Sequence, residues 1–247
     1  MKYEIIADFD STLTQKGEGL SNSFVALRDV MSAEGQKYSD DIFAFYAPKE
    51  FDFNIEATER DKLMKKWWEE EFDGLTKFNL YKNDLKRAAY MPNLLLREGI
   101  VEFFTFAKTN NIPVLIFTAG VADIIEMKLE KENLLSDNIS IIGNRFVFDK
   151  DGLIIDHIKP VVYVGNKHAI ARTWDAKVHG DIAFLLGDHP SDVYMCDDAN
   201  HQKVIRFGFL NGKSNEDGLY DKYDYLYTDG HESLVDVLDK IKLEINT

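Results

Sequence analysis

The sequence contains one cysteine, Cys196, and no long hydrophobic run. A lone thiol excludes an intrachain disulfide and a cysteine-based zinc site, and it is typical of a reducing compartment. The longest apolar segment, residues 112–117, is far shorter than the roughly 18 residues that a membrane span requires. The first residues also lack the succession of basic, apolar and small residues that marks a signal peptide. We therefore expect a cytoplasmic protein that does not interact with a membrane.

Positive charge is scarce as well. Lys and Arg number 29 against 43 Asp and Glu, which gives a formal net charge of −14 over 247 residues. Such an acidic chain is a poor partner for nucleic acids or anionic membranes, so we expect a small-molecule ligand. We also expect a monomer, although no sequence feature bears on the oligomeric state. Hydrophobic residues at 45% and charged residues at 29% are typical of a folded globular chain. The length suits one domain, or one domain with an insertion.

Hydrophobic patterning predicts an α/β fold. Short apolar segments alternate with helical ones, and we expect strands at residues 3–8, 112–117, 139–142 and 182–186, and helices at 121–133 and 233–245. Continuous apolar strands separated by helices imply a parallel sheet that is covered on both faces. Residues 145–148 and 153–155 flank Asp151-Gly152 and predict a hairpin. Residues 15–95 are rich in charged and aromatic residues with helical periodicity, which predicts a helical insertion.

The first predicted strand ends in a pattern that suits metal-dependent chemistry. Asp8-Phe9-Asp10-Ser11-Thr12 has the form DxDxT, and residues i and i+2 of an extended segment point to the same side. Two carboxylates at the carboxyl end of a parallel strand lie where open α/β sheets bind ligands, and their like charges need a cation. A hard divalent cation with oxygen ligands, Mg²⁺ first, fits this need. The alternative is an ordinary acidic turn after a strand.

Further polar residues follow the other predicted strands. Gly187-Asp188 and Asp192 come after the strand at 182–186, Thr118-Ala119-Gly120 after the strand at 112–117, and Lys167 begins a helical segment. Asp188 could supply a metal ligand or merely cap a helix. The Thr118 hydroxyl and the backbone N–H groups after it suit phosphate oxygens, and Lys167 could offer positive charge to a phosphoryl group. Each of these signals is weak alone.

Taken in order and spacing, these motifs resemble the haloacid dehalogenase-like (HAD) phosphohydrolases. The signatures of that superfamily fall on Asp8, Asp10 and Thr12, on Thr118, on Lys167, and on Asp188 and Asp192. The resemblance implies a Rossmann-like core of residues 1–14 and 96–247 with a parallel sheet, and an inserted helical (C1-type) cap domain of residues 15–95. Most of the chain also resembles the cytosolic pyrimidine 5′-nucleotidase III family, including its 7-methylguanosine-phosphate-specific branch. The resembling blocks are residues 46–52, 64–68, 97–104, 116–120, 166–168, 185–188 and 208–211.

The resemblance assigns a role to each residue. It implies that Asp8 is the nucleophile and becomes an aspartyl phosphate, and that Asp10 is the general acid and base. It places Mg²⁺ on the Asp8 carboxylate, the Asp10 backbone carbonyl and Asp188, and phosphoryl oxygens on Lys167, Thr118 and the backbone of Ala119 and Gly120. Thr12 supports the first motif, and Asp192 orients Lys167 or a metal-bound water, or caps a helix.

Substrate choice is expected to depend on the cap. By resemblance, Glu50 accepts hydrogen bonds from the base; the alternative is a solvated charge. Trp68 corresponds to an aromatic residue that stacks on the base, and a tryptophan suits a cationic methylated guanine; the alternative is a packed residue of a cap helix. Lys66 and Glu71 depart from the family pattern, so the base preference stays open between pyrimidine and 7-methylguanine.

The sequence therefore predicts a Mg²⁺-dependent 5′-nucleotidase acting on CMP, UMP or 7-methyl-GMP. Two alternatives remain. One is a HAD phosphatase for another small phosphomonoester, such as phosphoserine, in which the cap aromatics serve only as core. The other is a catalytically idle HAD fold that binds ligands. Retention of Asp8, Asp10, Lys167 and Asp188 together argues against the idle fold, because an unused cluster of like charges is costly.

Overall fold

The computed structural model describes residues 1–247 except 53, 174–179, 197–200, 217, 229–232 and 247. Its strands are β1 (Tyr3–Ala7), β2 (Val114–Val121), β3 (Ile139–Asn144), β4 (Phe146–Phe148), β5 (Ile154–His157), β6 (Ile182–Gly187), β7 (Lys203–Phe209) and β8 (Tyr225–Tyr227). Its helices are α1 (Ser23–Asp29), α2 (Ala33–Glu50), α3 (Ala57–Leu75), α4 (Lys82–Ala89), α5 (Ile100–Thr109), α6 (Ala122–Lys131), α7 (Lys167–Thr173), the 3₁₀ helix η1 (Asp192–Cys196) and α8 (Leu234–Ile245).

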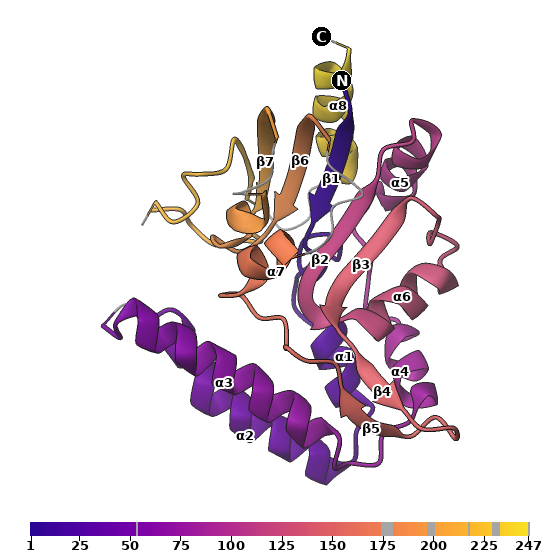
Figure 1. The fold of residues 1–247 in the computed structure, drawn as a ribbon, viewed down its shortest axis with the longest axis vertical. Helices are drawn as coiled ribbons and strands as arrows, with labels where there is room; N and C mark the ends of the chain where they lie inside the picture. The colour runs from indigo at the N-terminus through magenta and orange to yellow at the C-terminus, as the bar shows by residue number, and fades with distance from the viewer. Residues whose placement is uncertain (53, 174–179, 197–200, 217, 229–232, 247) are drawn as a thin grey trace.

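A parallel sheet forms the centre of the molecule (Figure 1). Its six strands run in the order β3-β2-β1-β6-β7-β8, and every pairing is parallel. In β1, Ile5 pairs with Val114 on one side and with Phe184 on the other. Because the strands are parallel, the segments that follow β1, β2 and β6 emerge at the same edge of the sheet. The order reverses at β1, and ligands of open α/β sheets bind at such a point.

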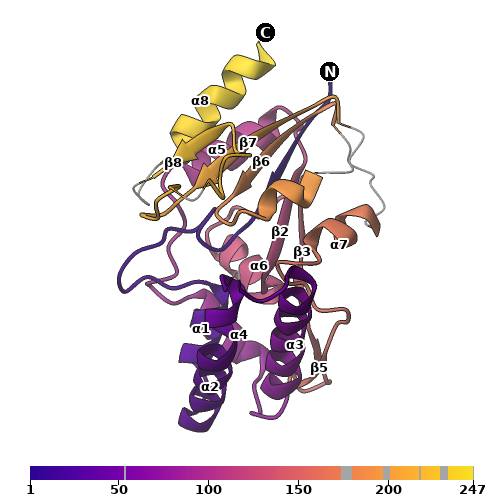
Figure 2. The same ribbon diagram turned by 90° about the vertical axis from the view of Figure 1, so that its left-hand side faces the viewer.

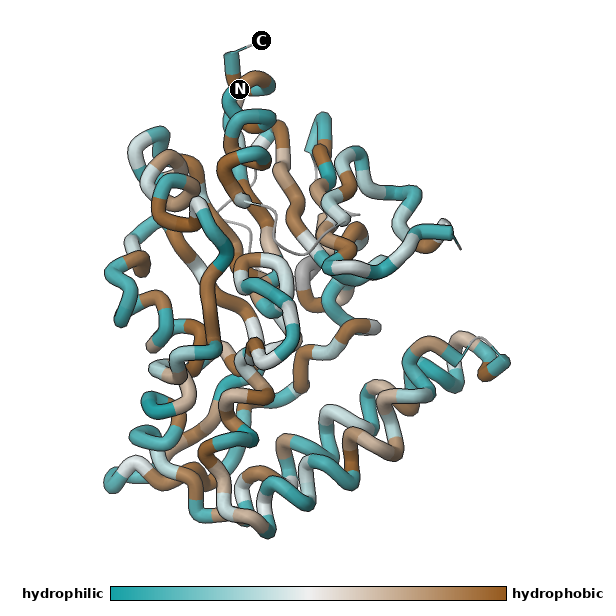
Figure 3. The backbone as a smooth tube through the Cα atoms, turned by 180° about the vertical axis from the view of Figure 1, so that it is seen from behind, coloured by the Kyte–Doolittle hydropathy of each residue, from teal (hydrophilic) through white to brown (hydrophobic). Residues whose placement is uncertain are grey.

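Both faces of the sheet are covered, as the apolar strands predict. On one face, Ile5 and Ala7 pack in a cluster with residues of α5, α6 and α8. On the other face, Ile6 lies in a second cluster with residues of η1 and with Tyr220 and Tyr223. Figure 3 shows the hydrophobic residues concentrated along the strands, with hydrophilic residues on the outer helices and loops. Successive side chains of a strand point to opposite faces of the sheet, so alternate residues of the strands belong to the two clusters that form the core.

Helices α1, α2, α3 and α4 lie together at one end of the molecule, whereas both chain termini lie at the opposite end (Figure 2). The predicted hairpin forms as β4 and β5, which pair antiparallel. It packs with these helices, because Phe146 and Ile154 share a buried cluster with Phe72 and Leu85. The helices between residues 15 and 95 therefore pack against a small two-stranded sheet, β4–β5, that comes later in the chain.

The α2–α3 hairpin is the longest projection of the molecule (Figure 1). Ser32 begins α2 by accepting a hydrogen bond from the Gly35 N–H, and Glu56 begins α3 by accepting from Thr58 and Glu59. The two helices approach closely at Gly74, where a Cβ atom would lie 2.2 Å from the Tyr38 ring. At its far end, the hairpin reaches the rest of the protein through the Tyr163 hydroxyl, which lies 3.1 Å from Asp61 Oδ2.

The remaining predictions differ from the structure at the element ends and at the sheet edge. The helix expected at 121–133 spans 122–131, and the one expected at 233–245 spans 234–245. Strands β7 and β8 were not predicted. Among the described residues, no helix combines the length and the apolar character needed to cross a membrane.

Candidate active site

The loop after β1 brings Asp8, Asp10 and Thr12 to the carboxyl edge of the sheet. The Asp8 backbone N–H still donates to the Leu186 carbonyl of β6, at 2.9 Å. Ser11 then adopts a left-handed backbone with φ of 64°, which turns the chain sharply. The Thr12 hydroxyl is fully buried and lies 3.4 Å from Asp188 Oδ1. Two of the sequence-predicted strand ends therefore meet.

The turn after β1 is held by Arg97, which precedes α5. Its guanidinium group is 1% exposed and donates to the backbone carbonyls of Ser11, Thr12 and Thr14. It also donates to Asn211 Oδ1, at 3.0 Å. A buried cation that binds carbonyls in a fixed fork geometry fixes the direction of a loop. Arg97 therefore shapes the segment that carries Asp8 and Asp10.

Lys167, at the start of α7, lies between two buried carboxylates. Its Nζ donates to Asp8 Oδ1 and to Asp192 Oδ1, both at 2.8 Å. Burial lowers the pKa of Lys167, but Asp192 and Asp8 raise it more, so its pKa stands above the ordinary value. The ammonium group is therefore permanently charged, and it compensates part of the local negative charge.

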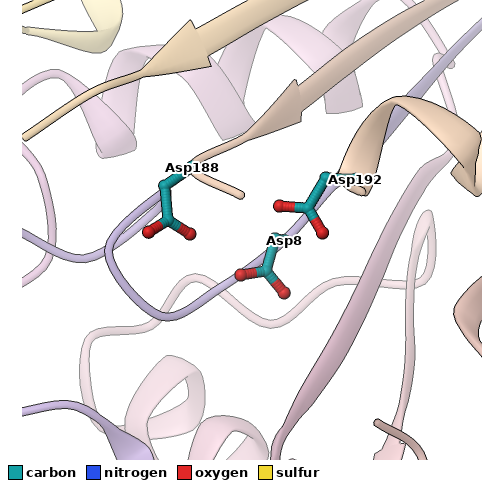
Figure 4. A group of neighbouring side chains, drawn as sticks. All are labelled: Asp8, Asp188 and Asp192. Atoms are coloured by element: carbon teal, nitrogen blue, oxygen red, sulfur yellow. The ribbon is translucent and has the colours of Figure 1, made fainter. Parts of the chain in front are cut away.

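Asp8, Asp188 and Asp192 form an acidic cluster (Figure 4). One carboxylate oxygen from each lies within 4.8 Å of the others. Burial raises the pKa of Asp8, as do Asp192 and Asp188, while Lys167 opposes the rise. Burial and Asp192 likewise raise the pKa of Asp188. Three ionised carboxylates would outnumber the single ammonium of Lys167, which is why burial and mutual repulsion raise these pKa values; a hard divalent cation, which suits oxygen ligands of this kind, would favour the ionised forms.

The Asp10 carboxylate makes its hydrogen bonds with Ser23, at the start of α1. Its Oδ1 accepts from the Ser23 backbone N–H at 2.8 Å, and its Oδ2 accepts from the Ser23 hydroxyl at 2.6 Å. The same Ser23 Oγ accepts from the Val121 N–H at 3.0 Å, which ties α1 to the end of β2. Burial raises the pKa of Asp10, and the two Ser23 hydrogen bonds lower it. Asp10 would thus bring only its backbone carbonyl to a metal at the acidic cluster, as the resemblance implies.

The end of β2 supplies the residues expected to hold a phosphoryl group. The Thr118 hydroxyl is buried and accepts from the Gly120 N–H at 2.9 Å. Gly120 has no room for a side chain, since a Cβ atom there would lie 2.5 Å from Asp10 Oδ2. Asn144 donates to the Ala119 carbonyl at 2.7 Å and so holds the backbone of this segment. The structure therefore brings Thr118, Ala119 and Gly120 beside the loop of Asp10.

Glu50, at the last position of α2, lines a cavity of about 610 Å³ between the end of the α2–α3 hairpin and the loop after β6. Its Oε1 lies 3.9 Å from His189 Nε2. Burial raises the pKa of Glu50, and Lys213 and Lys16 oppose this rise. The same two lysines also oppose the rise in the pKa of Asp188. Glu50 is therefore a partly desolvated carboxylate close to the acidic cluster and not a freely solvated one.

Trp68 is not among the residues that line this cavity. Its ring stacks on Trp67 and Phe72 at centroid distances of 6.0 Å and meets the edge of Phe24 at 5.8 Å. These contacts favour the packing alternative that the sequence left open. Met64, one helical turn earlier on α3, does line the cavity.

Three residues of the site were not identified from the sequence as functional. Ser23 holds Asp10, Arg97 holds the turn after β1, and His189 faces Glu50. The run Ser21-Asn22-Ser23 is a typical helix start and could have located α1. No local pattern shows, however, that Ser23, the first residue of α1, contacts Asp10. Arg97 and His189 depend on contacts between segments far apart in the chain.

Comparison with known proteins decides the family. Residues 11–244 match the family described as pyrimidine 5′-nucleotidase (UMPH-1). The chain belongs to this family of 5′-nucleotidases. The UMPH-1 match places it among the phosphoric monoester hydrolases, as the sequence predicted. Curated relatives agree: the chain is 29% identical to the 7-methylguanosine phosphate-specific 5′-nucleotidase of Gallus gallus, over 90% of this chain and 81% of that protein. It is 27% identical to the putative cytosolic 5′-nucleotidase 3 of Caenorhabditis elegans, over 100% of this chain and 70% of that protein.

Solved structures show the same fold. The crystal structure of cytosolic 5′-nucleotidase IIIB bound to cytidine matches with a TM-score of 0.82 and 22% identity, covering 98% of this chain and 88% of that one. A phosphoserine phosphohydrolase-like protein from Francisella tularensis matches with a TM-score of 0.64 and 18% identity, covering 98% of this chain and 100% of that one. The chain therefore shares the α/β fold of these proteins, with a six-stranded parallel sheet at its centre.

Proposed function

We propose that this protein hydrolyses nucleoside 5′-monophosphates, with CMP, UMP or 7-methyl-GMP preferred, through an aspartyl phosphate on Asp8. The observation that carries the proposal is the placement of Asp8, which meets Lys167 at 2.8 Å and shares an acidic cluster with Asp188. The proposed division is a core of residues 1–14 and 96–247 and a cap of residues 15–95, with the β4–β5 hairpin packed on the cap. We further propose a monomer that works in the cytoplasm.

The proposed reaction has two steps. An Asp8 carboxylate oxygen attacks phosphorus, the bond from phosphorus to the ribose 5′-oxygen breaks, and protonated Asp10 gives its proton to that oxygen. Asp10 then takes a proton from water, whose oxygen attacks the phosphorus of the aspartyl phosphate. Inorganic phosphate leaves and the Asp8 carboxylate is restored. Lys167, the Thr118 hydroxyl and the backbone of Ala119 and Gly120 hold the phosphoryl oxygens during both steps, with the Gly120 N–H exchanging its contact with Thr118 Oγ1 for one with a phosphoryl oxygen.

We propose Mg²⁺ as the cofactor, held by Asp8, Asp188 and the Asp10 backbone carbonyl. The residues fit it, because the excess buried negative charge of the acidic cluster calls for a hard cation with oxygen ligands. When bound, Mg²⁺ neutralises charge on the transferring group. Asp192 already accepts from Lys167 and from the His189 backbone N–H, so its proposed role is to orient Lys167.

The base is proposed to bind beside Glu50, whose carboxylate accepts hydrogen bonds from an amino or ring N–H group. A stacking role for Trp68 stays a prediction. If it stacks, Trp68→Ala should raise KM for 7-methyl-GMP about tenfold more than for UMP, because only the methylated base is cationic. Equal changes for the two nucleotides would make Trp68 a packing residue.

A substrate panel tests the proposed function. Phosphate release from CMP, UMP, 7-methyl-GMP, AMP, GMP and phosphoserine is measured with Mg²⁺, with Asp8→Asn as the matched control. We expect a preference for one of the first three, and a loss of about a thousandfold or more in the control. Preference for phosphoserine would favour the alternative phosphatase, and release from none would favour the idle fold. Unchanged release by Asp8→Asn would contradict the mechanism.

A further inference from the structure

His189 lies in the loop after β6, directly after Asp188, and its ring lines the cavity beside Glu50. The cavity combines residues of the α2–α3 hairpin with residues of the core loops; among them are Glu50, Phe51, Asp61, Met64, His189 and Tyr194. The Phe51 ring centroid lies 5.5 Å from that of His189. His189 is therefore a point at which the core meets the end of the cap hairpin.

The hydrogen bonds of His189 determine which ring nitrogen carries the proton. The Ser191 backbone N–H donates to His189 Nδ1 at 3.1 Å, and the Ser191 hydroxyl lies 2.8 Å from the same atom. A backbone N–H can only donate, so Nδ1 must accept and the proton of the neutral ring must be on Nε2. The loop thus presents an N–H donor to the cavity wall.

This donor has no partner in the part of the chain that the structure describes. His189 Nε2 is buried and makes no hydrogen bond. The carboxylate in front of it is that of Glu50, at 3.9 Å, and an approach of about 1 Å would make a hydrogen bond. Buried donors are normally satisfied, so a contact that completes this one is favoured. A movement of the last residues of α2 toward the core would bring Glu50 within hydrogen-bond distance of His189 Nε2.

We propose that His189 is a positioning residue for Glu50. When the hairpin end closes on a nucleotide, His189 Nε2–H donates to Glu50 Oε1 and leaves Oε2 to accept from an N–H edge of the base. This inference rests on the proposed function, since it uses Glu50 as the base-binding carboxylate. Base recognition on the cap is then fixed by the same loop that carries Asp188 and Asp192.

Two variants separate this role from a purely structural one. His189→Asn keeps a polar group near the Nδ1 position and removes the Nε2 donor, whereas His189→Gln keeps an amide donor near Nε2 and removes the Nδ1 acceptor. We expect His189→Asn to raise KM for the best nucleotide about tenfold with little change in kcat, and His189→Gln to restore most of the loss. If His189 acts only by accepting the Ser191 hydrogen bonds at Nδ1, His189→Gln should raise KM more than His189→Asn does. That result would overturn the proposal.

Two controls connect the effect to Glu50 and to the base. The inhibition constant of inorganic phosphate, which has no base, should change less than twofold in both variants. In a Glu50→Gln background, His189→Asn should raise KM less than twofold further, because residues that act through each other are not additive. Independent, multiplying effects would overturn the proposal.

The contact can also be measured without activity. Long-range ¹H–¹⁵N NMR of histidine-labelled Asp8→Asn protein should place the His189 proton on Nε2 in the free protein. Saturation with the best nucleotide should shift the Nε2 signal, and adding Glu50→Gln should reduce that shift. A proton on Nδ1 in the free protein, or an Nε2 signal that the bound nucleotide leaves unmoved, overturns the proposal. If the wild-type protein hydrolyses no nucleotide of the panel, the proposed function fails and the role of Glu50 with it, while the spectrum of the free protein still decides which nitrogen carries the proton.

Discussion

The ammonium group of Lys167 contacts two buried carboxylates at once, on Asp8 and on Asp192. The side chains of all three residues are less than a tenth exposed. Removing one member of such a group leaves uncompensated charge in a poorly solvated place, which costs more than the lost contact itself. Lys167 is therefore expected to contribute to the stability of the fold as well as to the proposed chemistry.

Lys167→Met should lower the free energy of unfolding by about 3 kcal/mol, because Asp8 and Asp192 then face each other unpaired. Urea unfolding measures the change, and adding Asp192→Asn should recover part of the loss. Lys150→Met is the control, since Lys150 is exposed and makes no ion pair within the described residues. Equal stability of the wild type and Lys167→Met would contradict the buried pairing.

Ser23→Ala should lower kcat about tenfold and leave KM nearly unchanged. The variant removes the hydroxyl that fixes Asp10 Oδ2, so the acid no longer stays directed at the leaving oxygen. Steady-state kinetics with the best nucleotide measure the effect. Ser21→Ala is the matched control, because the buried Ser21 hydroxyl donates to the Asn22 carbonyl instead. A kcat equal in both variants would mean that Asp10 does not need Ser23.

Among the elements, the α2–α3 hairpin contains an acid that titrates near neutral pH. Glu71 of α3 is 1% exposed, accepts from the Ser39 hydroxyl of α2 at 2.7 Å, and leaves its Oε2 without a partner in the described chain. Burial raises the pKa of Glu71 from 4.5 to about 7. Between these pH values the folded protein keeps a proton that the unfolded chain releases. The contribution of Glu71 to stability therefore falls as the pH rises through this window and no longer changes above it.

Glu71→Gln should remove this pH dependence. The stability gained by the variant over the wild type should grow by about 1–2 kcal/mol from pH 5.5 to pH 8 and then level off. Urea unfolding at several pH values measures it. Glu69→Gln serves as the control, since Glu69 is a half-exposed acid of the same helix. A gain that is constant with pH would show that Glu71 is ionised in the folded protein throughout.

How far the sequence predicts the elements depends on where their contacts lie. The strands β1, β2, β3 and β6 contain runs of apolar residues and were predicted, because burial in a parallel sheet leaves such a pattern in the sequence itself. Strand β7 carries Lys203 and Arg206, and β8 is only three residues long at the sheet edge. These two segments form strands because β7 pairs with β6 and β8 pairs with β7, and no local sequence pattern shows such pairing.

The same distinction applies to the site. Asp8 and Asp188 directly follow strands, and Thr118 lies near the end of β2, which extends past the predicted end at residue 117, so sheet topology alone brings them together. Ser23 and His189 act across the boundary between helices and sheet, and their contacts depend on how the helices pack. The predicted helices between residues 15 and 95 are present. The sequence predicted the hairpin that contains Phe146 and Ile154, but a turn pattern does not show that these residues pack against those helices.

For the whole molecule, the acidic cluster predicts a dependence of stability on Mg²⁺. A ligand that binds only the folded state stabilises it in proportion to the logarithm of its concentration. Adding 10 mM Mg²⁺ to chelator-treated protein should raise Tm by about 3 °C or more, and phosphate release should be lost with chelator and restored by Mg²⁺. Asp188→Asn, with fewer acidic ligands, should show a smaller rise. A Tm independent of Mg²⁺ in both proteins would contradict the proposed metal site.

The shape of the α2–α3 hairpin has a mechanical consequence. Helix α2 has 18 residues and is therefore about 27 Å long, and its root is fixed by Arg28–Asp40 and by the Asp73–His157 pair beside α3. If the contact between Tyr163 and Asp61 at the far end is released, a rotation of about 10° about the start of α2 displaces Glu50 by about 5 Å. Angular changes at the root are therefore amplified at Glu50, where the base is proposed to bind. A substitution that tilts this hairpin would move Glu50 although it lies many ångströms from the proposed base site.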